Sequence, residues 1–87
     1  MSYSFEFSMQ AWKGVSKGRC YDSDNRAKAA AMRVFKNRTS NPNDELRVYD
    51  GDCTTWFRDD ARYVGKVAYR HDGQTVDWFP PVEVGAG

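Results

Sequence analysis

The sequence contains few of the residues from which metal centres are usually built. Its 87 residues include two cysteines, Cys20 and Cys53, and a single histidine, His71. Two thiols and one imidazole without a recognisable spacing do not make a zinc-binding motif. We therefore expect no metal site and no cofactor. Both thiols are expected to be free and buried, in a protein of a reducing compartment such as the cytoplasm.

Long apolar runs are absent too, and one sign of charge is scarce in each half of the chain. No signal peptide or membrane-length segment is visible, so no membrane association is expected. The net charge is only +1, but residues 1–40 carry eight Lys/Arg against three Asp/Glu, whereas residues 41–87 carry five against nine. Such asymmetry indicates either a charged partner or simply solvated faces of opposite sign.

No catalytic motif is recognisable, and we predict that the protein is not an enzyme. His71 lies beside an expected turn, and no Ser or Cys has the surroundings of a nucleophile. The carboxylate pairs Asp50/Asp52 and Asp59/Asp60 fall in expected turns, where aspartate is common for reasons of turn geometry alone. They do not indicate acid–base chemistry.

One stretch, residues 24–37, has the pattern of an amphipathic helix. Its apolar residues recur at the spacing i, i+3, i+4, i+7, i+8, which places them on one face of a helix. Ser23 or Asp24 can cap the first turn, and Lys36 and Arg38 suit the negative end of the helix dipole. The small alanines allow close approach to a sheet. The apolar face consists of Ala27, Ala30, Ala31, Val34 and Phe35.

The first forty residues also predict a hairpin before this helix. Residues 3–12 alternate between apolar and polar side chains, with Phe5 and Phe7 on the buried face. Lys13-Gly14 reads as a tight turn, and residues 15–21 as the second strand. This register places Phe7 opposite Cys20.

The second half of the chain predicts a meander of strands. Residues 45–50 form a short strand, and the hairpin signal Asp50-Gly51 leads into a strand that ends near residue 58. A turn at Asp59-Asp60 precedes a strand over residues 62–70. In the last hairpin, Tyr69 faces Val76 and Val67 faces Trp78. Pro80-Pro81 ends the last strand, and residues 82–87 are expected to be a frayed tail.

These elements predict one α+β domain over residues 1–87. It is an antiparallel sheet of about five or six strands, ordered as hairpin, helix and meander, with one helix packed on one face. Because one helix cannot cover both faces, aromatic and basic side chains should lie on the open face, together with Lys66 and Arg70. The predicted partner-binding residues, including an acidic turn at the rim, are Trp12, Lys17, Arg19, Tyr21, Arg47, Tyr49, Trp56, Arg58, Asp59 and Asp60.

Several interpretations of this predicted surface stay open. Aromatic and arginine side chains dominate protein-binding hot spots, so a protein partner could be anchored by Trp12 or Trp56. Single-stranded nucleic acid is the alternative, since rings stack on bases while Lys and Arg contact phosphates. The face could also be a homodimer seam, or its rings could pack into a second small core.

Two segments carry a resemblance to a known family. The hairpin of residues 67–78, VAYRHDGQTVDW, and the strand-to-helix segment of residues 17–35 resemble a small type I-F anti-CRISPR family of phage-encoded inhibitors. Phage inhibitors of host RNA polymerase have a similar strand–helix–strand pattern. The resemblance implies a non-enzymatic inhibitor in the host cytoplasm that occludes a nucleic-acid-binding surface. Its partner would be a protein subunit of a CRISPR surveillance complex or of other host nucleic-acid machinery.

Overall fold

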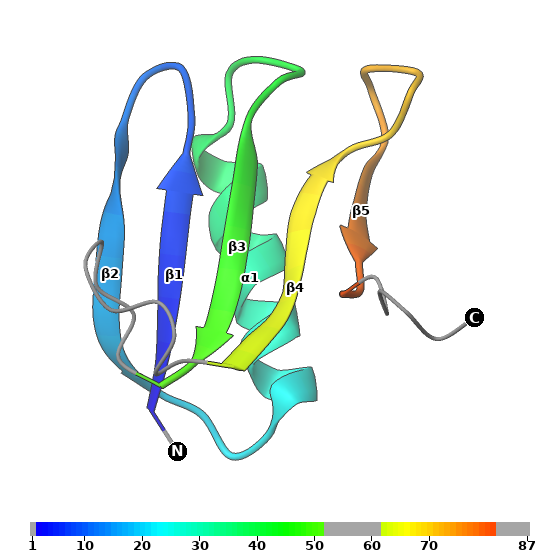
Figure 1. Ribbon diagram of the computed structural model, residues 1–87. Coiled ribbons are helices and arrows are strands. Elements are labelled where there is room, and N and C mark those ends of the chain that lie inside the picture. The colour runs from blue at the N-terminus through cyan, green and yellow to red at the C-terminus, as the bar shows by residue number, and fades with distance from the viewer. Residues whose placement is uncertain (1, 52–61, 82–87) are drawn as a thin grey trace.

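The protein has the α+β fold expected from its sequence. The computed structural model describes residues 2–51 and 62–81 (Figure 1). All strand pairs are antiparallel, and the five strands of this described part have the order β2-β1-β3-β4-β5. The elements are β1 (Ser2–Ser8), β2 (Lys13–Cys20), α1 (Asp24–Arg38), β3 (Glu45–Asp50), β4 (Arg62–Tyr69) and β5 (Val76–Phe79).

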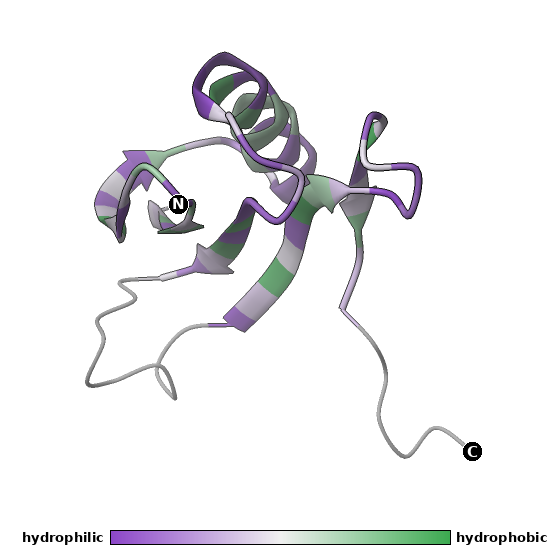
Figure 2. Ribbon diagram, turned by 90° about the horizontal axis from the view of Figure 1, so that it is seen from above, coloured by the Kyte–Doolittle hydropathy of each residue, from purple (hydrophilic) through white to green (hydrophobic). Residues whose placement is uncertain are grey.

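Helix α1 lies on one side of the sheet (Figure 2). Its N-cap is Ser23, whose side chain accepts a hydrogen bond from the backbone N–H of Arg26. Ala27, Ala31 and Phe35 are buried, as the helical spacing predicted. The main contacts of α1 are with β3, β4 and β5, so the helix covers one half of the sheet more than the other.

The hydrophobic core lies between α1 and the sheet. Phe7, Leu46, Val67 and Trp78 form one cross-strand row on the helix side, and the predicted register of the last hairpin is confirmed. Trp78 lies over Gly65, where a Cβ atom would be 2.3 Å from the indole ring. The largest fully buried apolar side chains are Tyr3, Phe5, Phe35, Leu46, Val48 and Val67.

The turn between β1 and β2 differs from the predicted one. Met9 and Trp12 exchange backbone hydrogen bonds of 3.1 and 3.3 Å, so the loop residues are Gln10 and Ala11 and not Lys13-Gly14. Phe7 therefore pairs with Gly14 instead of Cys20. The glycine that suggested a turn is a strand residue whose missing side chain leaves room for the ring of Trp12.

A β-bulge in β2 changes which side chains face the helix. Phe5 pairs with Ser16 and Tyr3 pairs with Arg19, so β2 has one extra residue between these two pairs. Gly18 lies in this bulge with φ of +71°, a conformation that glycine adopts without steric cost. Beyond the bulge, Arg19 faces the same side as Ser16.

For Cys20 the prediction of a free thiol is confirmed, but the prediction that it is buried is wrong. Cys20, at the end of β2, is a free and exposed thiol. The predicted register would have placed it on the buried face, opposite Phe7, and the observed register pairs it with Ser2 at the sheet end. Cys53, the predicted strand that ends near residue 58 and the tail 82–87 lie outside the described residues.

A buried carboxylate organises the loop between α1 and β3. Asp44 is 2% exposed, and it accepts hydrogen bonds from the backbone N–H groups of Gln10, Ser40 and Asn41 and from the Thr39 hydroxyl. Burial opposes ionisation of this carboxyl, but the donated hydrogen bonds outweigh it and hold its pKa below the ordinary value. Asp44 thus joins the β1–β2 turn to the end of the helix.

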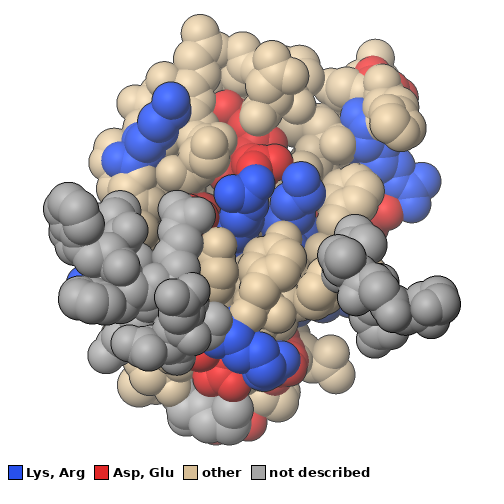
Figure 3. All heavy atoms as spheres, viewed as in Figure 1, with Lys and Arg blue, Asp and Glu red and all other residues tan. Residues whose placement is uncertain are grey.

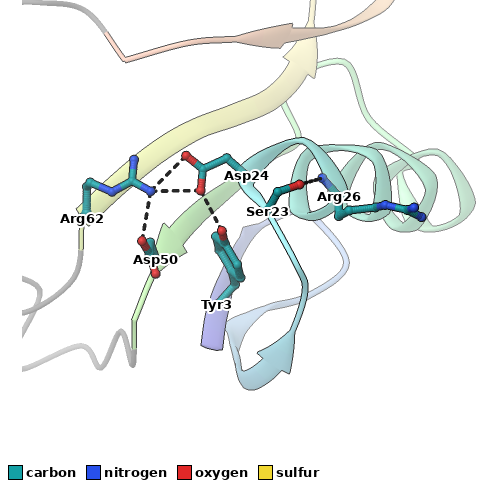
Figure 4. Close-up of polar contacts among 6 residues, drawn as sticks. All are labelled: Tyr3, Ser23, Asp24, Arg26, Asp50 and Arg62. Carbon is teal, nitrogen blue, oxygen red and sulfur yellow. Dashed lines mark hydrogen bonds and ion pairs between the residues drawn. The ribbon is translucent and has the colours of Figure 1, made fainter. Parts of the chain in front are cut away.

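A second polar cluster fastens the start of α1 to the sheet (Figure 4). Arg62 Nη2 lies 2.9 Å from carboxylate oxygens of both Asp24 and Asp50, and the Tyr3 hydroxyl donates a hydrogen bond of 2.7 Å to Asp24. The hydrogen bond from Tyr3, followed by that from Arg62, lowers the pKa of Asp24. Burial, together with the neighbouring Asp24, raises the pKa of Tyr3 to about 12.

Candidate macromolecule-binding surface

The open face of the sheet is built from charges that neutralise one another. Arg47 lies 2.8 Å from Glu45 and 3.9 Å from Glu6, and Lys66 lies 3.1 Å from Glu45. Figure 3 shows blue and red atoms side by side at the centre of this face. Arg47 is therefore on the open face as predicted, but its charge is compensated by residues of the same face.

The aromatic residues of the open face are mostly covered. The rings of Tyr49 and Tyr63 lie 5.5 Å apart, and the Tyr49 hydroxyl donates a 3.3 Å hydrogen bond to Glu6. Tyr49 is only 7% exposed, and burial raises the pKa of Tyr63. Tyr49 has the predicted orientation, but little of its ring is left for a partner to contact.

Trp12 lies on the helix side of the sheet, so the prediction that it faces the open side is wrong. Its indole packs edge-on against the core residue Phe7, with ring centroids 4.8 Å apart. The same indole lies over Gly14, which pairs with Phe7 on the neighbouring strand. Trp12 is 46% exposed and is the one large hydrophobic side chain with this exposure among the described residues.

Arg19 and Tyr21 also lie on the helix side and not on the open face. The Arg19 guanidinium sits 4.5 Å from the centre of the Phe5 ring, and the Tyr21 ring stacks on Phe5 at 6.0 Å. Arg19 lies on the helix side because the β-bulge shifts the alternation of side chains along β2 by one residue. Lys17 is exposed within the bulge. The remaining predicted contact residues, Trp56, Arg58, Asp59 and Asp60, lie outside the described residues.

The basic side chains divide into two groups according to their partners. In β3, β4 and the β4–β5 turn, the four described cations, Arg47, Arg62, Lys66 and Arg70, all form ion pairs. The eight cations of β2 and α1 form no ion pair with any residue in 2–51 or 62–81. We call their region the β2–α1 surface, which consists of Lys13, Lys17, Arg19, Arg26, Lys28, Arg33, Lys36 and Arg38.

Carboxylates are too few to balance the β2–α1 surface. Residues 13–38 contain only Asp22 and Asp24, and the second of these is held by Arg62. The asymmetry read from the sequence is therefore a spatial one. Within the described residues, the cations of β2 and α1 form no ion pairs, although Arg19 donates hydrogen bonds to Ser16 and Tyr21, whereas the cations of the later strands do form ion pairs. Among the described residues, β2 and α1 therefore carry an excess of positive charge.

Trp12 and one of these unpaired cations, Arg38, both contact the ring of Phe7. The Arg38 guanidinium lies 5.8 Å from the centre of the Phe7 ring, and Trp12 packs on the same ring. Sequence reasoning missed Arg38 as a surface residue, because its position in the last helical turn was explained by the helix dipole alone. Its place over the Phe7 ring depends on how α1 packs on the sheet, which no local pattern encodes.

No protein-family model, curated protein or solved structure matches the chain. Within residues 2–51 and 62–81, no group of three or more His, Cys, Asp or Glu side chains could hold a metal ion. The helix of this described part is not long and apolar enough to cross a membrane. The function is therefore argued from the chemistry of the surface alone.

Proposed function

We propose that the protein is a non-enzymatic binding protein that recognises a polyanionic macromolecule through the β2–α1 surface. The observation that supports this proposal is the contrast between eight unpaired cations on β2 and α1 and four paired ones on the later strands. An ion pair within the protein already satisfies a cation, whereas an unpaired exposed cation can gain an anionic partner.

The open face is the weaker candidate for this contact. Its cations Arg47 and Lys66 would have to leave Glu45 before they could bind a new anion. Its rings are largely covered, whereas Trp12 on the helix side is 46% exposed. A partner that covers Trp12 gains the burial of an aromatic ring in addition to charge neutralisation.

Retention on a heparin column tests this proposal with two variants of equal net charge. Arg33→Gln/Lys36→Gln removes two exposed, unpaired cations from α1, and Lys66→Gln/Arg70→Gln removes two ion-paired ones. We expect the first variant to elute at clearly lower salt than the parent and the second to elute near it. An equal decrease in the eluting salt concentration for both variants, or no retention of the parent at low salt, would contradict the proposal.

A second candidate is an inhibitor that docks on a protein subunit of host nucleic-acid machinery, such as a CRISPR surveillance complex. The specific observation in its favour is that the exposed Trp12 and Arg38 contact the same Phe7 ring, because tryptophan and arginine are among the residues most enriched in binding hot spots. Unpaired cations would repel a basic nucleic-acid groove, so this inhibitor would contact an acidic surface of its target.

Capture from host lysate after nuclease treatment distinguishes this second candidate. A protein complex retained by the parent but not by Trp12→Ala would support it. Loss of all captured proteins on nuclease treatment would show that nucleic acid links them to the column, and would count against direct docking.

A further inference from the structure

The surroundings of Trp12 are unusual for the described part of the chain. A Cβ atom at Gly14 would lie 2.7 to 3.3 Å from three atoms of the indole, so one side of the ring rests on bare backbone. The edge of the ring contacts Phe7, and nearly half of the side chain stays accessible. A flat aromatic surface thus rests on the strand and is left open to solvent.

Lysines and no acidic residues flank this ring along the chain, and the carboxylate of Asp44, which accepts a hydrogen bond from Gln10 in the same turn, is buried and accepts further hydrogen bonds from Thr39, Ser40 and Asn41. Residues 9–20 contain no Asp or Glu. Lys13 is the next residue and is exposed, although its pairing with Ser8 places it on the opposite face of the edge strand β2 from Trp12, and Arg38 lies on the helix side, over the Phe7 ring. Lys17 is exposed four residues further along the edge strand β2, about 13 Å away at the usual rise of a strand.

We propose that this group binds single-stranded nucleic acid, with a base stacked on Trp12 and phosphates beside Lys13, Lys17 and Arg38. The inference rests on the proposed function and names the polyanion. A sulfated polysaccharide or an acidic polypeptide needs only the cations, whereas a nucleic acid also offers a planar ring for the indole. A duplex hides the faces of its bases, so the stacking contact selects single strands.

The structure also explains why the stacking residue is Trp12 and not another ring. Trp78 lies over Gly65 in a similar way, but it is packed against the core and Lys28. Tyr49 and Tyr63 face each other on the open side. Among the described residues, only the indole of Trp12 combines wide exposure with neighbouring unpaired cations.

Fluorescence anisotropy with a labelled oligothymidylate of about 12 nucleotides tests the inference, a length within the usual site sizes of ~4–16 nucleotides. A duplex of the same length and polyglutamate are the comparison ligands. We expect the single strand to bind at least tenfold more tightly than the duplex. Trp12→Leu, which keeps an apolar side chain on Gly14 but removes the aromatic face, should weaken binding on the order of tenfold.

Three further variants separate stacking from folding and from charge. Trp12→Tyr should keep most of the affinity, because it retains a ring. Arg38→Gln should weaken binding, whereas Arg70→Gln, which removes the same charge from an ion pair with Asp77, should not. A Trp12→Ala variant that unfolds leaves the Leu and Tyr variants to decide the question.

Each contrary outcome has a separate meaning. If Trp12→Leu binds the oligonucleotide as the parent does, or if duplex and single strand bind equally, the inference is overturned while heparin retention keeps the proposed function. Binding of polyglutamate without binding of the oligonucleotide would assign the surface to an acidic protein and would also overturn it. If the parent binds none of these ligands, the inference is overturned, and if heparin does not retain the parent at low salt either, the proposed function falls with it.

Discussion

The indole of Trp12 rests on Gly14, two residues further along the chain, and a Cβ atom at Gly14 would lie 2.7 Å from the ring. This contact involves the most exposed aromatic side chain of the described residues and lies beside the turn of the first hairpin. A similar contact joins Trp78 to Gly65 on the covered half of the same face. The two contacts differ in the exposure of the ring, because Trp12 is open to solvent and Trp78 is packed against the core.

The first prediction compares alanine at these two glycines. At Gly14 the exposed indole can swing aside, so Gly14→Ala should cost less than about 1 kcal/mol of unfolding free energy. At Gly65 the new Cβ would meet the Trp78 ring at 2.3 Å and the Phe79 carbonyl oxygen at 2.9 Å, with φ of +146°. Gly65→Ala should therefore cost at least about 2 kcal/mol. Urea denaturation measures both, and equal costs would contradict the described packing of the two rings.

The second prediction concerns the interface between α1 and the sheet. Ala31 is fully buried, so Ala31→Asp places an unpaired charge in the core and should destabilise the fold by about 3 kcal/mol or more. Ala29, two residues earlier, is exposed, and Ala29→Asp is the matched control. Thermal denaturation should show a large decrease in melting temperature for Ala31→Asp only. An Ala31→Asp protein that melts with the parent would mean that this helix face is not buried.

The parts of the fold that could be predicted from sequence are those set by local periodicity. The bounds of α1, the strand at Glu45–Asp50 and the pairing of Val67 with Trp78 follow from spacing and turn residues. The pairing of β1 with β3 closes a long loop, and it depends on how hydrophobic faces meet in space. No local sequence pattern indicates the pairing of β1 with β3.

The candidate site was harder to predict because a single glycine can serve two purposes. A glycine at position 14 is compatible with a turn and also with a strand position on which an aromatic ring packs. The choice of the turn shifted the predicted pairing of β2 with β1 by several residues. The bulge at Gly18 then reversed the face of Arg19. The importance of basic and aromatic residues for binding stays a prediction, and the face on which Trp12, Arg19 and Tyr21 lie was predicted wrongly.

The third prediction concerns ionisation of Tyr3, whose pKa is raised from 10.0 to about 12 by burial and by Asp24. Because the neutral phenol is the form that the fold favours, its stabilising contribution is complete below about pH 10 and is lost as the pH rises through about 12. Ultraviolet titration of tyrosinate should show a phenol that titrates near pH 12 and is missing in Tyr3→Phe. A phenol lost instead from the group that titrates near pH 10 would contradict the hydrogen-bonded cluster.

The fourth prediction concerns the thiols. Cys20 is exposed, so a Cys53→Ser variant, in which Cys20 is the sole thiol, should react with a disulfide reagent in the native state at close to the rate of the denatured protein. Cys20→Ser in the same background is the blank. Protection of Cys20 until denaturation would contradict the placement of the end of β2.

The central claim is that the unpaired cations of the β2–α1 surface bind a polyanion, and the salt dependence of oligothymidylate binding tests it most directly. Each contacted cation that is removed should reduce the slope of log K against log salt by about 0.7 for a single strand. Lys17→Gln/Arg38→Gln should therefore flatten the slope by about 1.4, while Lys66→Gln/Arg70→Gln leaves it unchanged. Equal slopes for the two double variants would contradict the account.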